Sequence, residues 1–335
     1  MLQLCIMKTY FQAYDYRAPT EQMRYPYRRG RAKKPDSKRI EKYADTKLMH
    51  FSVFPSYFVI PFWYTTLLPL VRLLHHVIWD FFMPQYLRKI HLRRTPIQHV
   101  DHLLDEKVPF APEHVGCYMD FINMWIRPLT MLLKRFGIAQ GSKLCAEWLR
   151  YITLTYREAF AMYKICMTTT YRPKPTTQQI KRLYSVDPHY MCVPSLHIAI
   201  VNLCHAFYRM IFEREEFTEK EIEKWQNELF NHAVEIGETV LYLKQHSVNC
   251  IPAALYMMTR ITPELFTPQD AIIFIDSLFK DAPDVTPGDK TRINSHIRFI
   301  YERFLLEGAL EDDWKEPVLR WLKDYTPHTP AYADI

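Results

Sequence analysis

The chain has 335 residues, of which 48% are hydrophobic and 15% aromatic, with seven glycines and 23 prolines. This is enough apolar material for a sizeable core in one large domain or two average ones. Seven cysteines without a C-x-x-C pair or a framework spacing argue against a disulfide-rich secreted protein. The net charge is +6, and the basic residues are concentrated near the N-terminus.

The N-terminal arm, residues 1–47, is basic: residues 17–47 contain eleven Lys or Arg, including the run RRGRAKK at 28–34. Such an arm suits an anionic surface, either lipid headgroups or nucleic acid, although a solvated arm without a partner has the same composition. No zinc-knuckle spacing or RNA-binding sheet motif accompanies it, so we expect no nucleic-acid partner. The first apolar run, LQLCIM, is too short for a secretory signal. We therefore expect a membrane-associated or cytoplasmic protein.

The next segment, Leu48–Val71, contains no Asp, Glu, Lys or Arg and is long enough to cross a bilayer. Its three prolines and its aromatic residues fit an interfacial or buried segment equally well. The mean hydropathy of −0.23 argues against a chain with several conventional spans. We favour a soluble or peripheral helical bundle, and both peripheral and integral membrane contact stay open.

Low glycine content and long apolar stretches with helical spacing predict an all-α protein. We divide the chain into the arm, a helical core at 48–260 and a C-terminal helical extension at 261–335. In chain order, the core is expected to contain one or two apolar helices over Met49–Ile90 broken at Pro84, an amphipathic helix over Gly116–Phe136, a helix over Ser142–Thr170, an apolar helix over Ser195–Phe212, an exposed charged helix over Phe217–Phe230, and a helix over His232–Met258 that Pro252 kinks or stops.

Three of the Thr-Pro pairs in the extension are those at Thr262, Thr267 and Thr286. Each has the pattern of a helix start, because proline is favoured at the first helical position. We therefore expect three amphipathic helices between these pairs and about Tyr325.

The most informative feature is the run MCVPSLHIAIVN at 191–202, in which Pro-Ser-Leu-His opens an apolar helix. A helix that is apolar on every side must be buried. Its first N–H groups then need partners, and an anion is one answer, since a helix N-terminus attracts negative charge. Taken alone, Ser195 and His197 also fit an ordinary N-cap and a packed imidazole. The apolar helix behind them favours an anion site.

Basic residues and a second histidine flank this run. Lys164 and Arg172 lie upstream, where Arg can bind phosphate through two N–H groups and Lys as a point charge. His246 lies downstream, after Lys244. If this segment is helical, Cys250 lies one turn beyond His246 on the same face. A carboxylate there would orient the imidazole as in a catalytic triad, whereas a thiol is a weak acceptor. Each residue, taken alone, also fits an ordinary structural role.

The order Lys…Arg-Pro, Pro-Ser-x-His and a downstream His resembles the type 2 phosphatidic acid phosphatase and vanadium haloperoxidase superfamily. The Pro-Ser-Leu-His motif and the phrase at Thr239–His246 are most similar to the branch related to inositol-phosphorylceramide synthases. The resemblance covers roughly residues 148–255, about a third of the chain. It implies a helical bundle of the acid phosphatase and haloperoxidase type, with a phosphate pocket between the segments at 164–172, 195–197 and 239–250.

The resemblance implies a role for each matching residue. His246 would be the nucleophile that forms a phosphohistidine, and His197 would protonate the leaving oxygen. The phosphoryl oxygens would be held by Lys164, Arg172 and Ser195. The family's route needs no metal or other cofactor, and vanadate mimics its pentavalent phosphorus. We therefore expect no metal site and no cofactor.

Some positions depart from the family's pattern. The motif's second Arg corresponds to Val240, and its final Asp corresponds to Cys250, which takes the third catalytic position here. Lys244 or Arg157 is a candidate replacement for the missing Arg in phosphate binding. The spacing is Lys-x7-Arg instead of Lys-x6-Arg, and a frayed helix end or a π-bulge at Thr168–Thr170 would absorb the extra residue. Loss of one electrostatic contact of this kind typically lowers the rate on the order of 10²–10³-fold.

These observations support two hypotheses. The first is a phosphatase or phosphotransferase that acts on a lipid phosphate or other phosphomonoester through a phosphohistidine, with a phosphate ester or anionic lipid as its partner. The alternative is a catalytically weak or inactive relative that binds phosphate or lipid headgroups or serves as a scaffold. His91, His99 and His102 suggest a metal cluster only by their number, because their stretch is basic and has few carboxylates.

Overall fold

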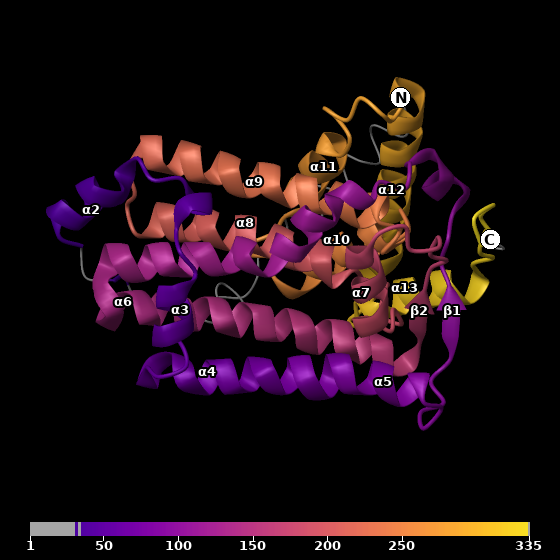
Figure 1. The fold of residues 1–335 in the computed structure, drawn as a ribbon, viewed down its shortest axis with the longest axis horizontal. Helices are drawn as coiled ribbons and strands as arrows, with labels where there is room; N and C mark the ends of the chain where they lie inside the picture. The colour runs from indigo at the N-terminus through magenta and orange to yellow at the C-terminus, as the bar shows by residue number, and fades with distance from the viewer. Residues whose placement is uncertain (1–30, 33–34, 334–335) are drawn as a thin grey trace.

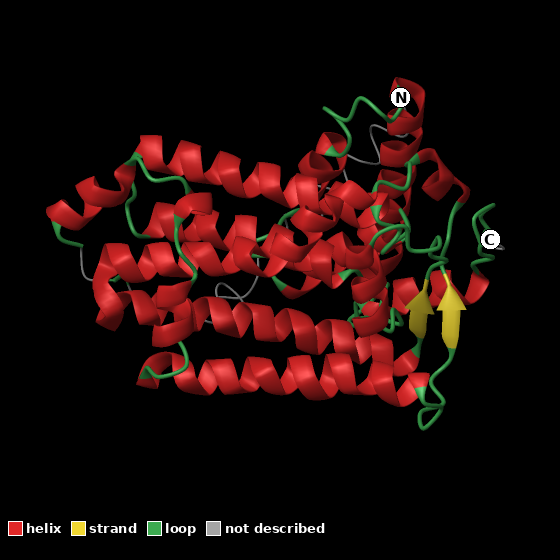
Figure 2. Cartoon of the chain, viewed as in Figure 1, coloured by secondary structure: helices red, strands yellow, loops and turns green. Residues whose placement is uncertain are grey.

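The computed structural model describes residues 31–32 and 35–333. Within these residues the fold is helical apart from one sheet of two short strands (Figure 2). This confirms the prediction of an all-α protein. Most of the predicted basic arm, at 1–30 and 33–34, lies outside the described residues.

Figure 1 labels the α-helices and the two β-strands. In chain order the elements are α2 (Ser37–Ala44), η1 (Leu48–His50), α3 (Phe54–Val59), α4 (Tyr64–His75), the π-helix η2 (His76–Phe82), α5 (Met83–Lys89), β1 (Ile97–His99), η3 (Leu103–Lys107), η4 (Pro112–His114), α6 (Val115–Ile165), β2 (Met167–Thr169), α7 (Gln178–Val186), α8 (Leu196–Arg214), α9 (Glu219–Tyr242), α10 (Cys250–Ile261), α11 (Pro268–Ser277), α12 (Pro287–Glu307), η5 (Gly308–Leu310) and α13 (Lys315–Asp324). The two strands pair in parallel, with Ile97 opposite Met167.

Helix α8 is the buried centre of the fold. It packs against α6 and α9, which run beside it in Figure 1, and against α10. Ser195 caps it, because the side-chain oxygen accepts the N–H of Ile198 at 3.4 Å. The predicted helix start is therefore confirmed. An apolar helix of this length is stable in water only where its neighbours cover the whole circumference.

The long helix α6 consists of two antiparallel arms that meet at Gly137. This glycine has φ 73° and ψ 164°, a conformation that other residues rarely adopt. The Cys145 thiol donates to the carbonyl oxygen of Leu129 at 3.7 Å, and the rings of Trp125 and Trp148 are 6.1 Å apart. Residues before the glycine therefore face residues after it, and the predicted helix end at this glycine is confirmed.

The helix predicted over Ser142–Thr170 is wrong at both ends. The second arm of α6 begins directly after the glycine turn and ends at Ile165. The residues that follow form strand β2, because three consecutive β-branched threonines favour an extended backbone over a helix. The extra residue between Lys164 and Arg172 is thus accommodated by a strand, and neither a frayed helix nor a π-bulge is needed.

The helix predicted over His232–Met258 is two helices, α9 and α10, with a turn between them. In the turn, Lys244 has a φ of +53°, which interrupts the helical path. Pro252 lies in the first turn of α10, where a missing N–H breaks no intrahelical bond, so it neither kinks nor stops the helix. His246 and Cys250 therefore do not share one continuous helix.

Helices α4, η2 and α5 form one continuous outer helix over Tyr64–Lys89. The predicted break at Pro84 does not occur. This proline lies in the first turn of α5, directly after the π-helical segment, where the hydrogen-bond pattern already changes. Among the described residues, this is the one helix that is long and apolar enough to cross a membrane. Its outer side is not covered by the protein: Leu68 and Trp79 are each 56% exposed.

The C-terminal helices pack against the end of the bundle. Thr267 and Thr286 cap α11 and α12, as predicted, but Thr262 ends α10 and precedes a turn. The third helix, α13, begins at Lys315 without a Thr-Pro pair. Helix α10 packs on α12, and residues of both belong to one hydrophobic core. The proposed boundary between residues 260 and 261 stays a prediction.

Candidate functional site

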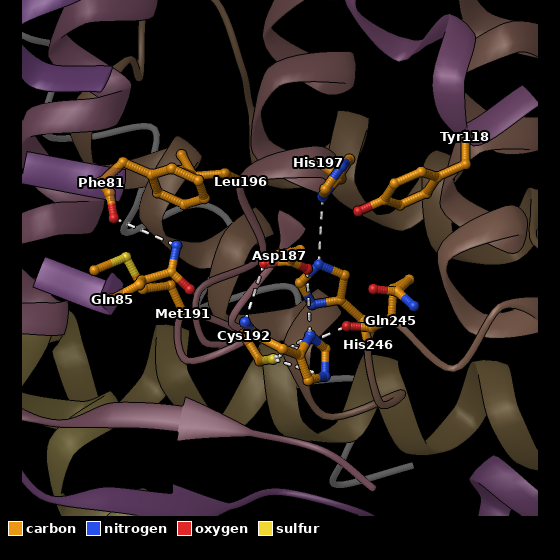
Figure 3. Close-up of a pocket in the computed structure, with 11 residues that line it drawn as sticks. Phe81, Gln85, Tyr118, Asp187, Met191, Cys192, Leu196, His197, Gln245 and His246 are labelled. Carbon is orange, nitrogen blue, oxygen red and sulfur yellow. Dashed lines mark hydrogen bonds and ion pairs between the residues drawn. The ribbon is translucent and has the colours of Figure 1, made fainter. Parts of the chain in front are cut away.

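The Pro-Ser-Leu-His motif and His246 meet at a cavity of about 30 Å³ near one end of the bundle (Figure 3). His246 Nε2 lies 3.2 Å from the hydroxyl oxygen of Ser195 and 3.4 Å from Nδ1 of His197. Helix α8 begins at Leu196, so its first N–H groups, which have no partners within the helix, lie beside these side chains. The structure therefore brings three predicted site residues together.

The segment that leads into α8 is held by strand β2 and by α6. The hydroxyl oxygen of Thr168 accepts the N–H groups of Cys192 at 3.1 Å and Val193 at 2.7 Å. The Tyr163 hydroxyl donates to the carbonyl oxygen of Pro194 at 2.5 Å. The strand that the sequence did not predict thus fixes the approach to the motif.

Two buried charged side chains, Lys244 and Asp105, stabilise the turn that carries His246. The ammonium group of Lys244 donates to the backbone carbonyl oxygen of Asp105 at 2.6 Å and to that of Val108. The Asp105 carboxylate accepts the N–H of Val248 at 2.8 Å, and burial raises the pKa of this group to about 6. Lys244 is therefore occupied in positioning the turn, and the structure does not place it at the cavity as a phosphate ligand.

Arg172 lies one contact away from the cavity. Its guanidinium group donates to the Asp187 carboxylate at 2.7 Å and to the side-chain oxygen of Gln245 at 2.8 Å, and both partners line the cavity. Burial acts to raise the pKa of Asp187, but hydrogen bonding to His189 and the charge of Arg172 hold it below its ordinary value. The ionised carboxylate neutralises Arg172, so an anion that enters must compete with Asp187 for the guanidinium group.

The second ring nitrogen of His246, Nδ1, lacks a hydrogen-bond partner that would orient the imidazole. Nδ1 of His246 is buried and has no hydrogen-bond partner among the described residues. Cys250 does not fill this role, because its sulfur accepts the N–H of Ser247 at 3.4 Å. A buried polar atom without a partner typically costs about 1–3 kcal/mol. With Cys250 at the position where a carboxylate was considered, Nδ1 of His246 is thus left without an orienting acceptor.

Lys164 does not lie at the cavity. Its side chain is exposed, and its ammonium group lies 4.7 Å from the centroid of the Phe160 ring. The neighbouring Tyr163 reaches toward the start of α8, and adjacent residues on a helix point about 100° apart. Of the predicted cationic ligands, Arg172 is therefore the one that the structure places next to the site.

Most of the cavity wall comes from residues that sequence reasoning did not select. These are Phe81, Gln85, Tyr118, Asp187, His189, Met191, Cys192, Leu196 and Gln245. An Asp-Pro-His sequence in the proline-rich loop before the motif is a signal that could have identified Asp187 and His189. Phe81 and Gln85 belong to the outer helix, far away in the sequence, and no local pattern marks them.

Cys192 places a thiol in the cavity. Its sulfur lies 3.6 Å from Nε2 of His189, and the Thr170 hydroxyl lies 2.7 Å from the same nitrogen. Burial acts to raise the pKa of Cys192, but its contacts with Cys250 and His189 lower it below the ordinary thiol value. The cavity therefore holds a second potential nucleophile beside His246.

Ring stacking accounts for His99 and His102, whereas His91 is exposed. The rings of His99 and Tyr171 stack with centroids 4.1 Å apart, and those of His102 and His296 with centroids 3.9 Å apart. In the described part of the chain, none of the three belongs to a group of convergent metal-binding side chains.

Comparisons of the chain with protein-family models, curated proteins and solved structures found no match. The functional argument therefore depends on the contacts and charges of the cavity.

We expect the half-buried ring of His197 to make the folded protein sensitive to acid. Burial, followed by the neighbouring His246, lowers the pKa of His197 to about 3, whereas an unfolded histidine titrates near 6.5. As the pH falls below 6.5, the unfolded chain binds a proton that the folded chain excludes, so folding stability is lost. Between pH 7 and pH 5 this one group removes about 2 kcal/mol.

We expect His197→Gln to show a smaller loss of stability than the wild type between pH 7 and pH 5, measured by urea denaturation. His50→Gln, which changes an exposed ring, serves as the control and should keep the wild-type loss. Equal losses in His197→Gln and the wild type would contradict a neutral, half-buried His197.

Proposed function

We propose that the protein transfers phosphoryl groups from a lipid phosphate or another phosphomonoester, with His246 as the nucleophile. The observation that carries this proposal is the contact of His246 Nε2 with both Ser195 and His197 beside a helix N-terminus. Helix N–H groups and the nearby Arg172 supply hydrogen-bond donors for phosphoryl oxygens. The imidazoles of His197 and His246 thus line one cavity, and candidate anion-binding groups lie beside it.

The proposed reaction has two steps. The lone pair of His246 Nε2 attacks phosphorus, the bond between phosphorus and the ester oxygen breaks, and His197 gives its proton to that oxygen. Water then attacks phosphorus and gives a proton to His197, the nitrogen–phosphorus bond breaks with its electrons returning to His246 Nε2, and inorganic phosphate leaves. An alcohol in place of water would make the reaction a transfer. Because its pKa is low, His197 is neutral at pH 7, and the negative charge of a bound phosphate would favour its protonated form.

The outer helix favours a lipid over a soluble ester as the substrate. Phe81 and Gln85 line the cavity and belong to the helix whose other side exposes Leu68 and Trp79. Exposed apolar surface of this extent is typical of a membrane or protein contact. Exposed basic side chains, such as Lys89 at the end of this helix, suit anionic headgroups. We propose that this helix lies against an anionic membrane and places the cavity beside the headgroups.

Phosphate release should be measured from phosphatidic acid in phosphatidylcholine vesicles, from short-chain phosphatidic acid and from para-nitrophenyl phosphate. We expect vanadate-sensitive release that is fastest from vesicles. His246→Ala should remove it, because no nucleophile remains. His197→Ala should lower it on the order of 10²–10⁴-fold, as expected for the loss of a general acid.

The matched control is His205→Ala, which changes another histidine of α8 that lines a different cavity. This variant should keep the wild-type turnover, and circular dichroism should show intact helices in all variants. Fastest release from the soluble ester would contradict the lipid assignment alone. Turnover that survives in His246→Ala would contradict the proposed nucleophile.

A second candidate function is a weak or inactive relative that binds phosphate headgroups. Two observations favour it: Nδ1 of His246 has no partner, and Asp187 neutralises Arg172. A site of this kind would hold a headgroup without turning it over, because the nucleophile is poorly oriented and the phosphate ligand is already paired.

Cys250→Asp separates the two candidates. An aspartate at the start of α10 would be favoured by the helix dipole and could accept a hydrogen bond from Nδ1 of His246. We expect phosphate release to rise on the order of 10²-fold. Cys250→Asn, of similar size but without charge, is the control and should give a smaller rise. Unchanged release from folded Cys250→Asp would show that the orientation of His246 does not limit the rate.

The corresponding substitution at the other departing position, Val240→Arg, is not a suitable test. The side chain of Val240 is completely buried in the core, so an arginine there would bury an unpaired charge and destabilise the fold.

A further inference from the structure

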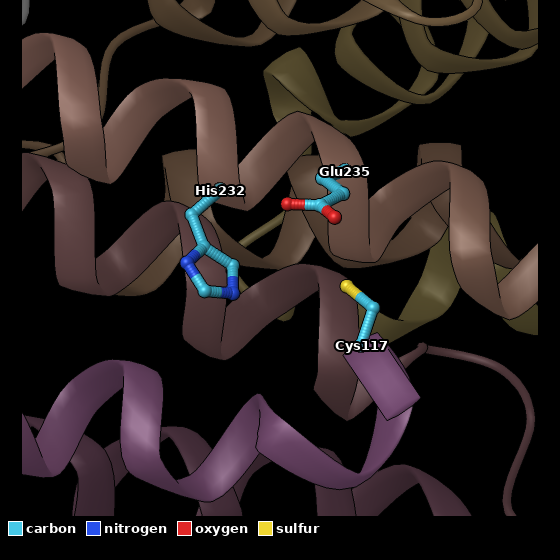
Figure 4. Close-up of side chains that lie close together, drawn as sticks. All are labelled: Cys117, His232 and Glu235. Carbon is cyan, nitrogen blue, oxygen red and sulfur yellow. The ribbon is translucent and has the colours of Figure 1, made fainter. Parts of the chain in front are cut away.

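A second cluster of reactive side chains lies between α6 and α9, apart from the cavity wall. Cys117 from the first arm of α6 faces His232 and Glu235 from α9, and their potential ligand atoms all lie within 4.8 Å of one another. In Figure 4 the three side chains point toward the space between the two helices. The sequence analysis predicted no metal site, and these residues lie on helices far apart in the chain, where no local motif marks them.

The two helices hold these side chains in a fixed arrangement. His232 and Glu235 are three positions apart on α9, so they project from the same face one turn apart. Cys117 lies in the first turn of α6, which packs against α9. Sites on regular helices are held more precisely than sites on loops, so the three ligand atoms, all within 4.8 Å of one another, are held near one centre.

The local charge favours a cation. In the described part of the chain, Glu235 forms no ion pair with Lys, Arg or His. Asp120, which acts electrostatically on both Cys117 and His232, holds the nearby Arg127 through two hydrogen bonds of 2.6 and 2.7 Å. The positive charge of Arg127, which acts on His232, is thus already neutralised, and the carboxylate of Glu235 lies beside a thiol and an imidazole.

We propose that Cys117, His232 and Glu235 bind one zinc ion, or a divalent ion of similar preference, with water as the fourth ligand. Thiolate, imidazole and carboxylate are all ligands of zinc, which is usually tetrahedral. Binding releases the thiol proton of Cys117 to solvent, and no electron transfer is involved. The ion would tie the start of α6 to α9, next to Tyr118, which lines the phosphate cavity.

Cobalt titration tests the proposal on untagged, chelator-treated full-length protein. We expect one equivalent of Co²⁺ to produce the sulfur-to-cobalt charge-transfer absorption and the visible bands of a tetrahedral ion, and Zn²⁺ to displace it. Cys117→Ser should remove the charge-transfer band, and His232→Gln should weaken binding. The matched control is Cys166→Ser, which changes another partly exposed thiol and should keep the full spectrum.

Folding is monitored separately by circular dichroism, and Zn²⁺ should raise the unfolding temperature of the wild type more than that of Cys117→Ser. A folded wild type without a charge-transfer band, or an identical band in Cys117→Ser, would overturn the proposal. Because the measurement reads metal binding and not phosphate release, its outcome is independent of the proposed phosphoryl transfer.

Discussion

The site depends on the burial of the N-terminus of α8. An apolar helix that is enclosed on every side has nowhere in water to satisfy its first N–H groups, so the protein must supply partners for them. Ser195 supplies one through its hydroxyl oxygen. The same hydroxyl lies 3.2 Å from Nε2 of His246, so the group that caps the start of α8 also contacts the candidate nucleophile. An anion that binds here would meet the remaining N–H groups and the positive end of the helix dipole.

Patterns within one segment predicted structure well, and contacts between distant segments could not be predicted. The start of α8 and the helix end at Gly137 were both read from local residues. Strand β2 was predicted as helix, because its stability comes from pairing with β1 and from the hydrogen bonds of Thr168 with Cys192 and Val193. The turn that contains His246 was also predicted as helix, because a left-handed Lys244 held by two carbonyl oxygens leaves no periodic signal.

The candidate site shows the same division. Ser195, His197 and His246 were selected from the sequence, and they meet in the structure. Lys164 was selected from the order Lys…Arg-Pro and the resemblance, but strand β2 follows in place of the expected helix end and Lys164 is exposed. Asp187 was missed, although it decides how strongly the cavity attracts anions, because it pairs with the predicted phosphate ligand. Whether the proposed site would turn over a phosphate ester or only bind it therefore depends on contacts that only the folded chain reveals.

The most direct test of the account is to trap the covalent intermediate. The protein would be mixed with phosphatidic acid vesicles, quenched in alkaline denaturant, which preserves phosphohistidine, and digested for mass spectrometry. The account predicts an acid-labile phosphoryl group on His246 that is absent when vanadate is added before the substrate. Turnover without any phosphoryl group on His246, or with one on Cys192, would contradict it.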